Sequence, residues 1–258
     1  MKLWAIAFNT FRENVRDKVL YNLLVFAVLM IGLSIALGKM TIGEQERITI
    51  DVGLSSISIF GVMMSIFLGI GLVSKEIEKK TIYTLIAKPM PRYLFILGRF
   101  SGLMLTIGIN TLVMAAAFTL SLWYIHGGGG WPLNWSIVQA IFLIYLEFGI
   151  IIAAAMLFST FSTPILSSIF TLCFVVIGRL TEGLLTFAEH SKDQVFFYGA
   201  RVLYYLVPNL NNYVMIDLAL YGDVMPGRLL LRMVAVGILT TAFLLGLAIA
   251  IFQRRDFV

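Results

Sequence analysis

The chain has 258 residues, of which 60% are hydrophobic and 13% are charged. Soluble domains average roughly 45–50% apolar and about 25% charged residues, and exposing this much apolar surface to water would promote association. The net charge of +5 is modest and unevenly distributed, so it does not indicate binding to nucleic acid. The composition therefore excludes an ordinary soluble domain and predicts an integral membrane protein.

Residues 1–18 are too polar to span a membrane and have the pattern of an amphipathic helix. Large apolar side chains recur at the spacing of one helix face: Trp4, Phe8, Phe11 and Val15. Polar side chains cover much of the remainder: Asn9, Arg12, Glu13, Arg16 and Asp17. Basic helices with an aromatic apolar face lie in the headgroup layer of a membrane. We therefore expect an interfacial helix; packing on another subunit is the alternative, and one helix can do both.

Six long apolar segments follow, and each has the roughly 20 residues that a helix needs to cross the hydrocarbon core. They are approximately residues 20–37, 55–73, 99–125, 137–160, 164–186 and 229–252. Basic residues mark the cytoplasmic side of such spans. With both termini inside, twelve Lys and Arg fall on that side and seven on the outer side. The sequence therefore predicts an all-α integral membrane protein with six transmembrane helices and both termini in the cytoplasm.

The expected outer connections carry no nucleotide-binding motif. The first, 38–54, has a Gly-Lys pair at 38–39 but lacks the upstream Gly and the following hydroxyl residue of a phosphate-binding loop. The glycine tract at 127–130 is flanked by Trp and Tyr, which is typical of an interfacial turn. The last connection, 187–228, is rich in Phe and Tyr and is interrupted at Pro208. Its short apolar runs suit re-entrant or interfacial helices better than spans.

Two charges inside the apolar segments are expected to pair. Ionisable groups at membrane depth are costly, and a partner is expected for each. Glu147 lies 13 residues before the short turn at 160–164, and Arg179 lies 15 residues after it. At 1.5 Å per residue both are roughly 20 Å from that turn, on adjacent antiparallel helices. Two alternatives remain open: a proton or cation site at Glu147, or Glu147 facing hydroxyl groups or a partner subunit while Arg179 extends outward.

The 74–98 segment between the second and third spans is strongly basic. Its cationic side chains are Lys75, Lys79, Lys80, Lys88 and Arg92. Glu76 and Lys80 have the favourable i, i+4 order for a helix, and Pro89 ends that helix because it has no backbone donor. We expect a short amphipathic helix below the second span, able to dock in a groove of a soluble partner. A solvated connector with lipid-facing lysines is the alternative.

This segment resembles the connection between the second and third spans in permease subunits of type-2 ABC exporters. The matching residues are Glu76, Thr81, Leu85, Pro89, Arg92, Gly98 and Arg99. Lys80 departs from the pattern, because the family commonly has Gly at that position. The amphipathic N-terminal helix, the six spans and the Leu-Val-Pro-Asn stretch at 206–209 extend the resemblance over nearly the whole chain.

The resemblance implies a non-catalytic transport subunit, without a cofactor or metal of its own, that moves a substrate by ATP hydrolysis on a separate ATPase subunit. That ATPase would bind ATP and Mg²⁺ on the cytoplasmic face of a prokaryotic inner membrane. A second copy, or a related permease, would complete the transporter, and membrane lipids are the other expected partner. Residues 1–18 would be the elbow helix and 75–87 the coupling helix. The coupling residues would be Lys75, Glu76, Lys79, Lys80, Thr81, Leu85, Pro89 and Arg92.

Other function classes fit the sequence less well. A secondary transporter using Glu147 would favour more intramembrane charges and a repeat between halves, and neither is evident. An intramembrane enzyme would need clustered His, Asp or Ser at helical spacing within the spans, and the sequence shows no such cluster. A non-transporting assembly or scaffold subunit is the remaining alternative.

Overall fold

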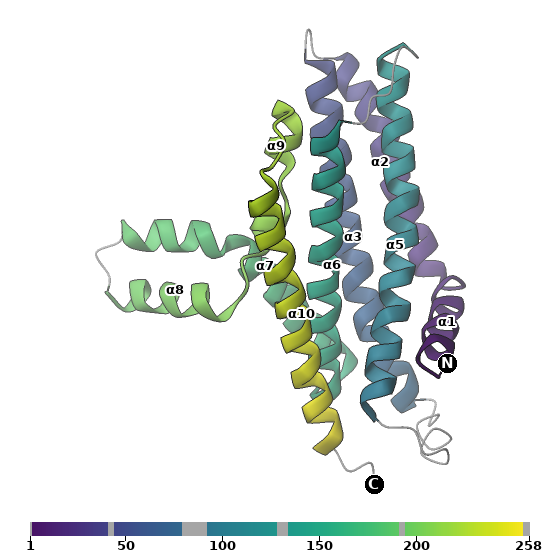
Figure 1. Cartoon of the computed structure of the whole chain (residues 1–258), viewed down its shortest axis with the longest axis vertical. Helices are drawn as coiled ribbons and strands as arrows, with labels where there is room; N and C mark the ends of the chain where they lie inside the picture. Colours follow the sequence, from purple (N-terminus) through teal and green to yellow (C-terminus); the bar gives the residue numbers. More distant parts are fainter. Residues whose placement is uncertain (1, 41–43, 79–91, 128–133, 191–193, 255–258) are drawn as a thin grey trace.

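The computed structural model describes residues 2–40, 44–78, 92–127, 134–190 and 194–254. Every regular element in these ranges is a helix, and the long helices lie side by side along the long axis of the molecule (Figure 1). The elements are α1 (Lys2–Asn14), α2 (Lys18–Lys39), α3 (Gln45–Glu78), α5 (Arg92–Ile125), α6 (Trp135–Phe161), α7 (Pro164–Glu189), α8 (Gln194–Leu206), the 3₁₀ helix η1 (Leu210–Tyr213), α9 (Ile216–Tyr221) and α10 (Gly227–Arg254).

Six of the described helices are long and apolar enough to cross a membrane: α2, α3, α5, α6, α7 and α10. A helix satisfies its backbone hydrogen bonds internally, which is what a segment in hydrocarbon requires. The predicted all-α, six-helix membrane architecture is therefore confirmed. The orientation of the two termini stays a prediction.

Several helices are longer than the apolar segments that predicted them. α3 begins at Gln45, so residues 45–54 are helical where the sequence predicted a connection. α3 also continues to Glu78, and α5 begins at Arg92, so both ends of the 74–98 segment are helical. Hydropathy measures the length of a helix inside hydrocarbon, whereas a helix can continue into the polar layer beyond it.

α6 is the central helix of the bundle. Its buried residues extend from Ser136 to Thr160 and occupy all its faces. α3, α5, α7 and α10 pack around it. α2, α7 and α10 instead expose many large apolar side chains. A helix that is apolar on every side belongs in the interior, and the outer helices present their free faces to lipid or to another protein.

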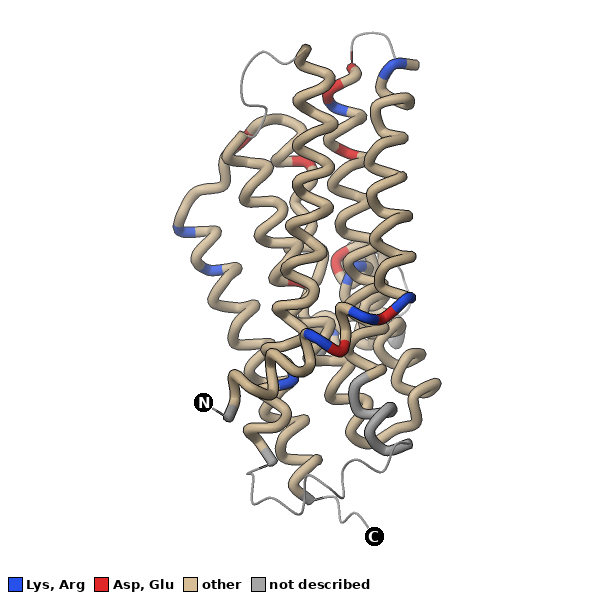
Figure 2. Tube along the Cα trace, turned by 90° about the vertical axis from the view of Figure 1, so that its right-hand side faces the viewer, with Lys and Arg blue, Asp and Glu red and all other residues tan. Residues whose placement is uncertain are grey.

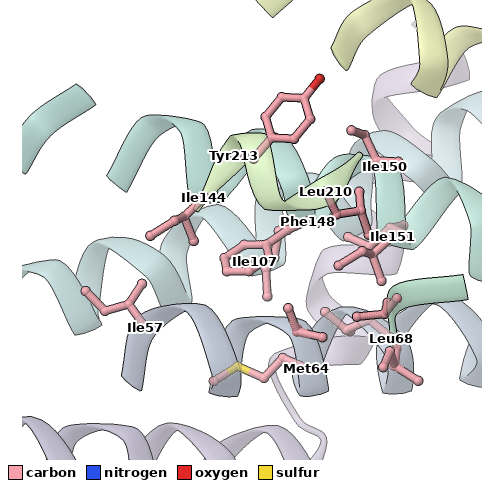
Figure 3. Packing of buried hydrophobic residues seen from close by; sticks show 14 of the residues in the cluster. Ile57, Met64, Leu68, Ile107, Ile144, Phe148, Ile150, Ile151, Leu210 and Tyr213 are labelled. Carbon is pink, nitrogen blue, oxygen red and sulfur yellow. The ribbon is translucent and has the colours of Figure 1, made fainter. Parts of the chain in front are cut away.

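Close contact between α3 and α6 depends on a glycine. Phe148 of α6 is fully buried, and its ring lies against Gly61 of α3, where a Cβ atom would overlap the ring. Figure 3 shows Phe148 among buried side chains that include Met64 and Ile144. The missing side chain at position 61 thus creates the space that the Phe148 ring fills.

α1 lies across the bundle axis and packs on the first half of α5 (Figure 1). Gly98 and Gly102 of α5 face it: a Cβ at 98 would crowd Ile6, and a Cβ at 102 would crowd Thr10. The small α5 surface allows the two backbones to approach closely. α1 therefore packs on α5 through close contact between the two backbones as well as through its own apolar side chains.

The predicted outer segment 187–228 contains helices of its own. The last part of α7 and α8 form a hairpin that projects sideways from the bundle (Figure 1). η1 returns to the bundle and buries Leu210 and Tyr213. Burial raises the pKa of Tyr213 to about 12. Its hydroxyl donates a hydrogen bond to the Met233 carbonyl oxygen at 3.3 Å. η1 is thereby fixed to α10.

Replacing Gly61 with alanine tests the α3–α6 contact. The added methyl would overlap the Phe148 ring, and overpacking of a core costs about 1–3 kcal/mol. We expect a lower midpoint of thermal unfolding in detergent for Gly61→Ala. Gly246→Ala in α10 is the matched control, because a Cβ there has no atom within 4 Å and alanine favours a helix. Equal midpoints for the two variants would contradict the close contact.

Candidate functional site

Three of the eight predicted coupling residues fall within the described residues, at the end of α3 and the start of α5. Lys75 and Glu76 belong to the last turns of α3, and Arg92 is the first residue of α5. The remaining ones lie outside the described residues: Lys79, Lys80, Thr81, Leu85 and Pro89. Their coupling role stays a prediction.

Four of the predicted elbow residues are on α1 and Arg16 follows its end, with the Trp4 and Phe8 side chains turned away from the bundle. Trp4 is 68% exposed and Phe8 is 52% exposed, whereas Ala7 and Thr10 on the opposite face are buried against the bundle. Phe11 is half-buried; Arg12 and Arg16 are exposed. An exposed aromatic stripe beside exposed arginines is the arrangement expected of a helix at the membrane surface.

Glu147 is the most deeply buried charge in the described structure. It lies near the middle of α6 and has no exposed surface. Its neighbours along the helix, Ile144, Phe148 and Ile151, are also fully buried. Burying an unpaired carboxylate in such surroundings would cost much free energy. The ionised Glu147 side chain therefore needs a countercharge from another helix.

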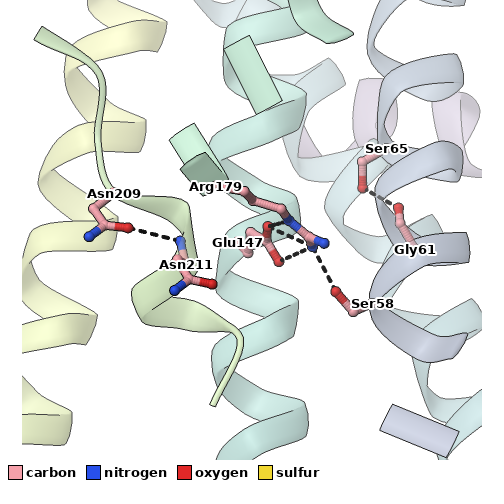
Figure 4. Close-up of polar contacts among 7 residues, drawn as sticks. All are labelled: Ser58, Gly61, Ser65, Glu147, Arg179, Asn209 and Asn211. Carbon is pink, nitrogen blue, oxygen red and sulfur yellow. Dashed lines mark hydrogen bonds and ion pairs between the residues drawn. The ribbon is translucent and has the colours of Figure 1, made fainter. Parts of the chain in front are cut away.

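Arg179 of α7 supplies that countercharge through a bidentate ion pair (Figure 4). Its Nε donates to Oε1 of Glu147 at 3.0 Å, and its Nη2 donates to Oε2 at 3.1 Å. Nη2 also donates to the hydroxyl oxygen of Ser58 on α3 at 2.7 Å. Bidentate pairs of this kind fix orientation as well as distance. The cluster therefore links α3, α6 and α7 at one point.

The segment after α8 packs directly beside this cluster. A Cβ at Gly178, next to Arg179 in α7, would crowd the Leu210 side chain and the Pro208 carbonyl oxygen. Asn209 caps η1 by accepting a hydrogen bond from the backbone N–H of Asn211 at 3.1 Å (Figure 4). The Pro-Asn pair thus starts η1 at the point where it contacts α7.

The geometry determines what this cluster can do chemically. Both carboxylate oxygens of Glu147 accept hydrogen bonds from Arg179. This arrangement favours a structural ion pair over the proton or cation site that the sequence left open. Only the Arg179 side chain has surface exposure, 27% against 0% for Glu147. The cluster is therefore a joint between helices.

Sequence reasoning missed Ser58 and Gly178. Ser58 is one of four serines in the second apolar segment, with Ser55, Ser56 and Ser65, and an intramembrane hydroxyl near the depth of a charge pair is a usable signal. Gly178 directly precedes the only arginine in the fifth segment. Neither signal says which neighbouring helix the residue faces, because that depends on how the helices rotate when they pack.

No metal site is found in the described ranges. They contain no group of three or more His, Cys, Asp or Glu side chains arranged to hold an ion. The imidazole rings of His126 and His190 each lie near a carbonyl oxygen of their own helix, Leu122 and Thr186 respectively. Both histidines therefore contact the backbone at the end of a helix.

Comparison with known protein families identifies a match over most of the chain. Residues 4–257 match the family model described as ABC-2 family transporter protein. A search of curated proteins found no match. The matched range includes nearly all of α1, the six long helices and the cluster at Glu147, so the similarity covers nearly the whole fold described above.

Charge-neutralising variants test the ion pair. Glu147→Gln alone leaves the Arg179 guanidinium without its anion, and breaking a buried pair in this way costs about 3–5 kcal/mol. Glu147→Gln combined with Arg179→Gln removes both charges and should recover most of that loss. Ser58→Ala should cost only about 1 kcal/mol, since it removes one hydrogen bond. Unfolding free energies from denaturant titration in mixed micelles measure all three.

Glu44→Gln is the control, because its partner Arg47 lies 3.6 Å away in an exposed pair and such pairs contribute little. Independent, additive losses for the single and double variants at 147 and 179 would show that the two charges do not stabilise each other.

Proposed function

Because the chain belongs to the ABC-2 transporter family, we propose that it is the membrane-spanning permease subunit of an ABC exporter in a prokaryotic inner membrane. The observation that carries this proposal is the family match over residues 4–257, together with six helices able to span a membrane. The chain itself does not hydrolyse ATP, and a separate ATPase subunit supplies the energy for transport.

The sequence supports a division of labour between two chains. It contains no G-x-x-x-x-G-K-[ST] motif, which is the loop that binds nucleotide phosphates in P-loop ATPases. The charged residues between the second and third spans are instead suited to contact a soluble subunit. ATP and Mg²⁺ therefore belong to the ATPase.

The proposed ATPase contact lies at the ends of α3 and α5. Lys75 and Glu76 are in the last turns of α3, and Arg92 opens α5. α3 is one continuous helix of 34 residues, so Ser58 lies roughly 30 Å from its Glu78 end. A displacement imposed on that end reaches the Arg179–Glu147 pair through a single rigid element. This is our account of how ATPase closure moves α6 and α7.

The α7–α8 hairpin supports pairing with a second copy of the chain. It extends sideways beyond the bundle (Figure 1) and exposes apolar and aromatic side chains, among them Tyr198, Val202 and Tyr205. Helices that leave a bundle gain few contacts within their own chain. A second permease subunit would cover this hairpin and add the missing contacts.

Co-purification with an ATPase tests the proposal. The ATPase to use is the one encoded beside this chain, expressed together with an affinity-tagged permease. We expect recovery of the wild-type complex and a loss of bound ATPase of roughly tenfold or more for Glu76→Ala with Arg92→Ala, since truncating charged contacts at an interface weakens binding by this amount.

Glu44→Ala with Arg47→Ala is the matched control. It removes one acidic and one basic side chain at the opposite end of α3, where no ATPase contact is proposed. Failure of the wild-type chain to bring down any ATPase would contradict the proposed function. Equal recovery by the two double variants would place the contact elsewhere.

A further inference from the structure

The α7–α8 hairpin leaves the bundle near the middle of the long helices. A Cβ atom at Gly178 of α7 would lie 3.1 Å from the carbonyl oxygen of Pro208, just after α8. The next residue, Arg179, pairs with Glu147 near the middle of α6. Both arms of the hairpin extend sideways from this point (Figure 1). The hairpin therefore lies near the depth of the ion pair, where hydrocarbon surrounds a membrane-spanning bundle.

Two opposite charges of the hairpin are exposed near this depth. Glu182 lies about one turn beyond Gly178 on α7, and Arg201 lies on α8; both residues are exposed. Elsewhere the long helices carry few charged residues between their ends (Figure 2). A charged side chain that faces hydrocarbon costs much free energy unless it is paired.

The chain itself does not neutralise these two charges within the residues that the structure describes. Neither Glu182 nor Arg201 forms an ion pair there. The Glu182 carboxylate accepts one long hydrogen bond, 3.5 Å from the side-chain nitrogen of Asn209. Each charge therefore needs a partner that this chain does not supply in the described ranges.

The surface around Arg201 has the composition of a protein interface. Tyr198, Val202 and Tyr205 lie on the same face of α8 as Arg201, at helical spacing, and they are 63–75% exposed. Tyrosine and arginine are enriched where proteins contact one another. Lipid tails would cover the apolar part of this face but would leave the guanidinium without an anion. A protein partner with a carboxylate at the same depth satisfies both requirements.

We propose that two copies of the chain pair through this hairpin, with Glu182 of one protomer bound to Arg201 of its partner. A two-fold axis repeats every contact, so each dimer contains two of these ion pairs. One exposed anion and one exposed cation on the same hairpin give the charge complementarity that a self-pairing surface needs. This inference rests on the proposed pairing of two permease copies and names the residues that make it.

Charge-reversal variants test the pairing. Full-length chains that carry donor or acceptor dyes are reconstituted in lipid vesicles, and energy transfer between protomers is measured as the chains are diluted with lipid. Glu182→Lys and Arg201→Glu each place like charges together twice in a dimer. We expect each variant to weaken self-association by roughly tenfold or more, since like charges at an interface are strongly unfavourable. Glu44→Lys, the same charge change in an exposed pair on another part of the molecule, should leave association unchanged.

Mixing the two variants separates contacts between protomers from contacts within one chain. The Glu182→Lys chain has two basic residues at these positions, and the Arg201→Glu chain has two acidic ones. A mixed dimer therefore contains only contacts between opposite charges. We expect the mixture to associate as tightly as the wild type, although neither variant does so alone. Wild-type association of either variant alone, or no recovery in the mixture, would overturn the proposal.

Cysteine cross-linking decides if a charge-reversal variant does not fold. Cys173 is the only cysteine of the chain, so Cys173→Ala gives a cysteine-free background. In that background, Glu182→Cys chains mixed with Arg201→Cys chains should be cross-linked by a short bis-maleimide more readily than either chain alone. Equal cross-linking in the three samples, or none in the mixture, would contradict the assigned contact.

These measurements use the chain without an ATPase, so their outcome is separate from that of the co-purification. Recovery of the ATPase together with unchanged self-association of the charge-reversal variants would remove the assigned contact and leave the proposed function in place. Loss of self-association without recovery of any ATPase would do the reverse.

Discussion

A carboxylate buried in a membrane protein needs a countercharge, and Glu147 receives its countercharge from a different helix. This requirement constrains much of the bundle. α7 must present Arg179 at the depth of Glu147 on α6, and α3 must bring Ser58 within 2.7 Å of the same guanidinium. Gly178 must remain small so that η1 can pack beside the pair. Removing Arg179 leaves the Glu147 carboxylate in apolar surroundings, where unpaired charge is costly, and a side chain at position 178 would displace η1.

The pairing of Glu147 and Arg179 could be expected from the sequence because the turn between their helices is short. Because the two helices are antiparallel and joined by a short turn at 160–164, the number of residues between each charge and the turn gives its depth. The structure places the two side chains in contact. Ser58 could not be chosen among its neighbouring serines in this way, since helix rotation depends on packing. The contact between Gly61 and Phe148 could not be predicted from the sequence for the same reason. The six spans were predictable because hydropathy reports length in hydrocarbon, but the start of α3 at Gln45 was not.

The end of the bundle where α3 and α5 meet and the α7–α8 hairpin are proposed to have different tasks. The α3–α5 end is proposed to receive the movement of an ATPase, and α3 connects it to the three-helix joint. α1 lies near that end, seated on the small α5 surface at Gly98 and Gly102. The α7–α8 hairpin projects in another direction and offers its exposed apolar surface to a second subunit. The family match covers all these parts.

The ionisation state of Glu147 is the most direct test of the joint between α3, α6 and α7. Infrared difference spectra of the wild type minus Glu147→Gln, recorded in lipid nanodiscs at neutral pH, isolate the signal of this one carboxyl group. A bidentate ion pair with Arg179 predicts carboxylate bands and no protonated-carboxyl stretch. A protonated-carboxyl band assigned to Glu147 in the wild type would show that the ion pair does not hold these helices together.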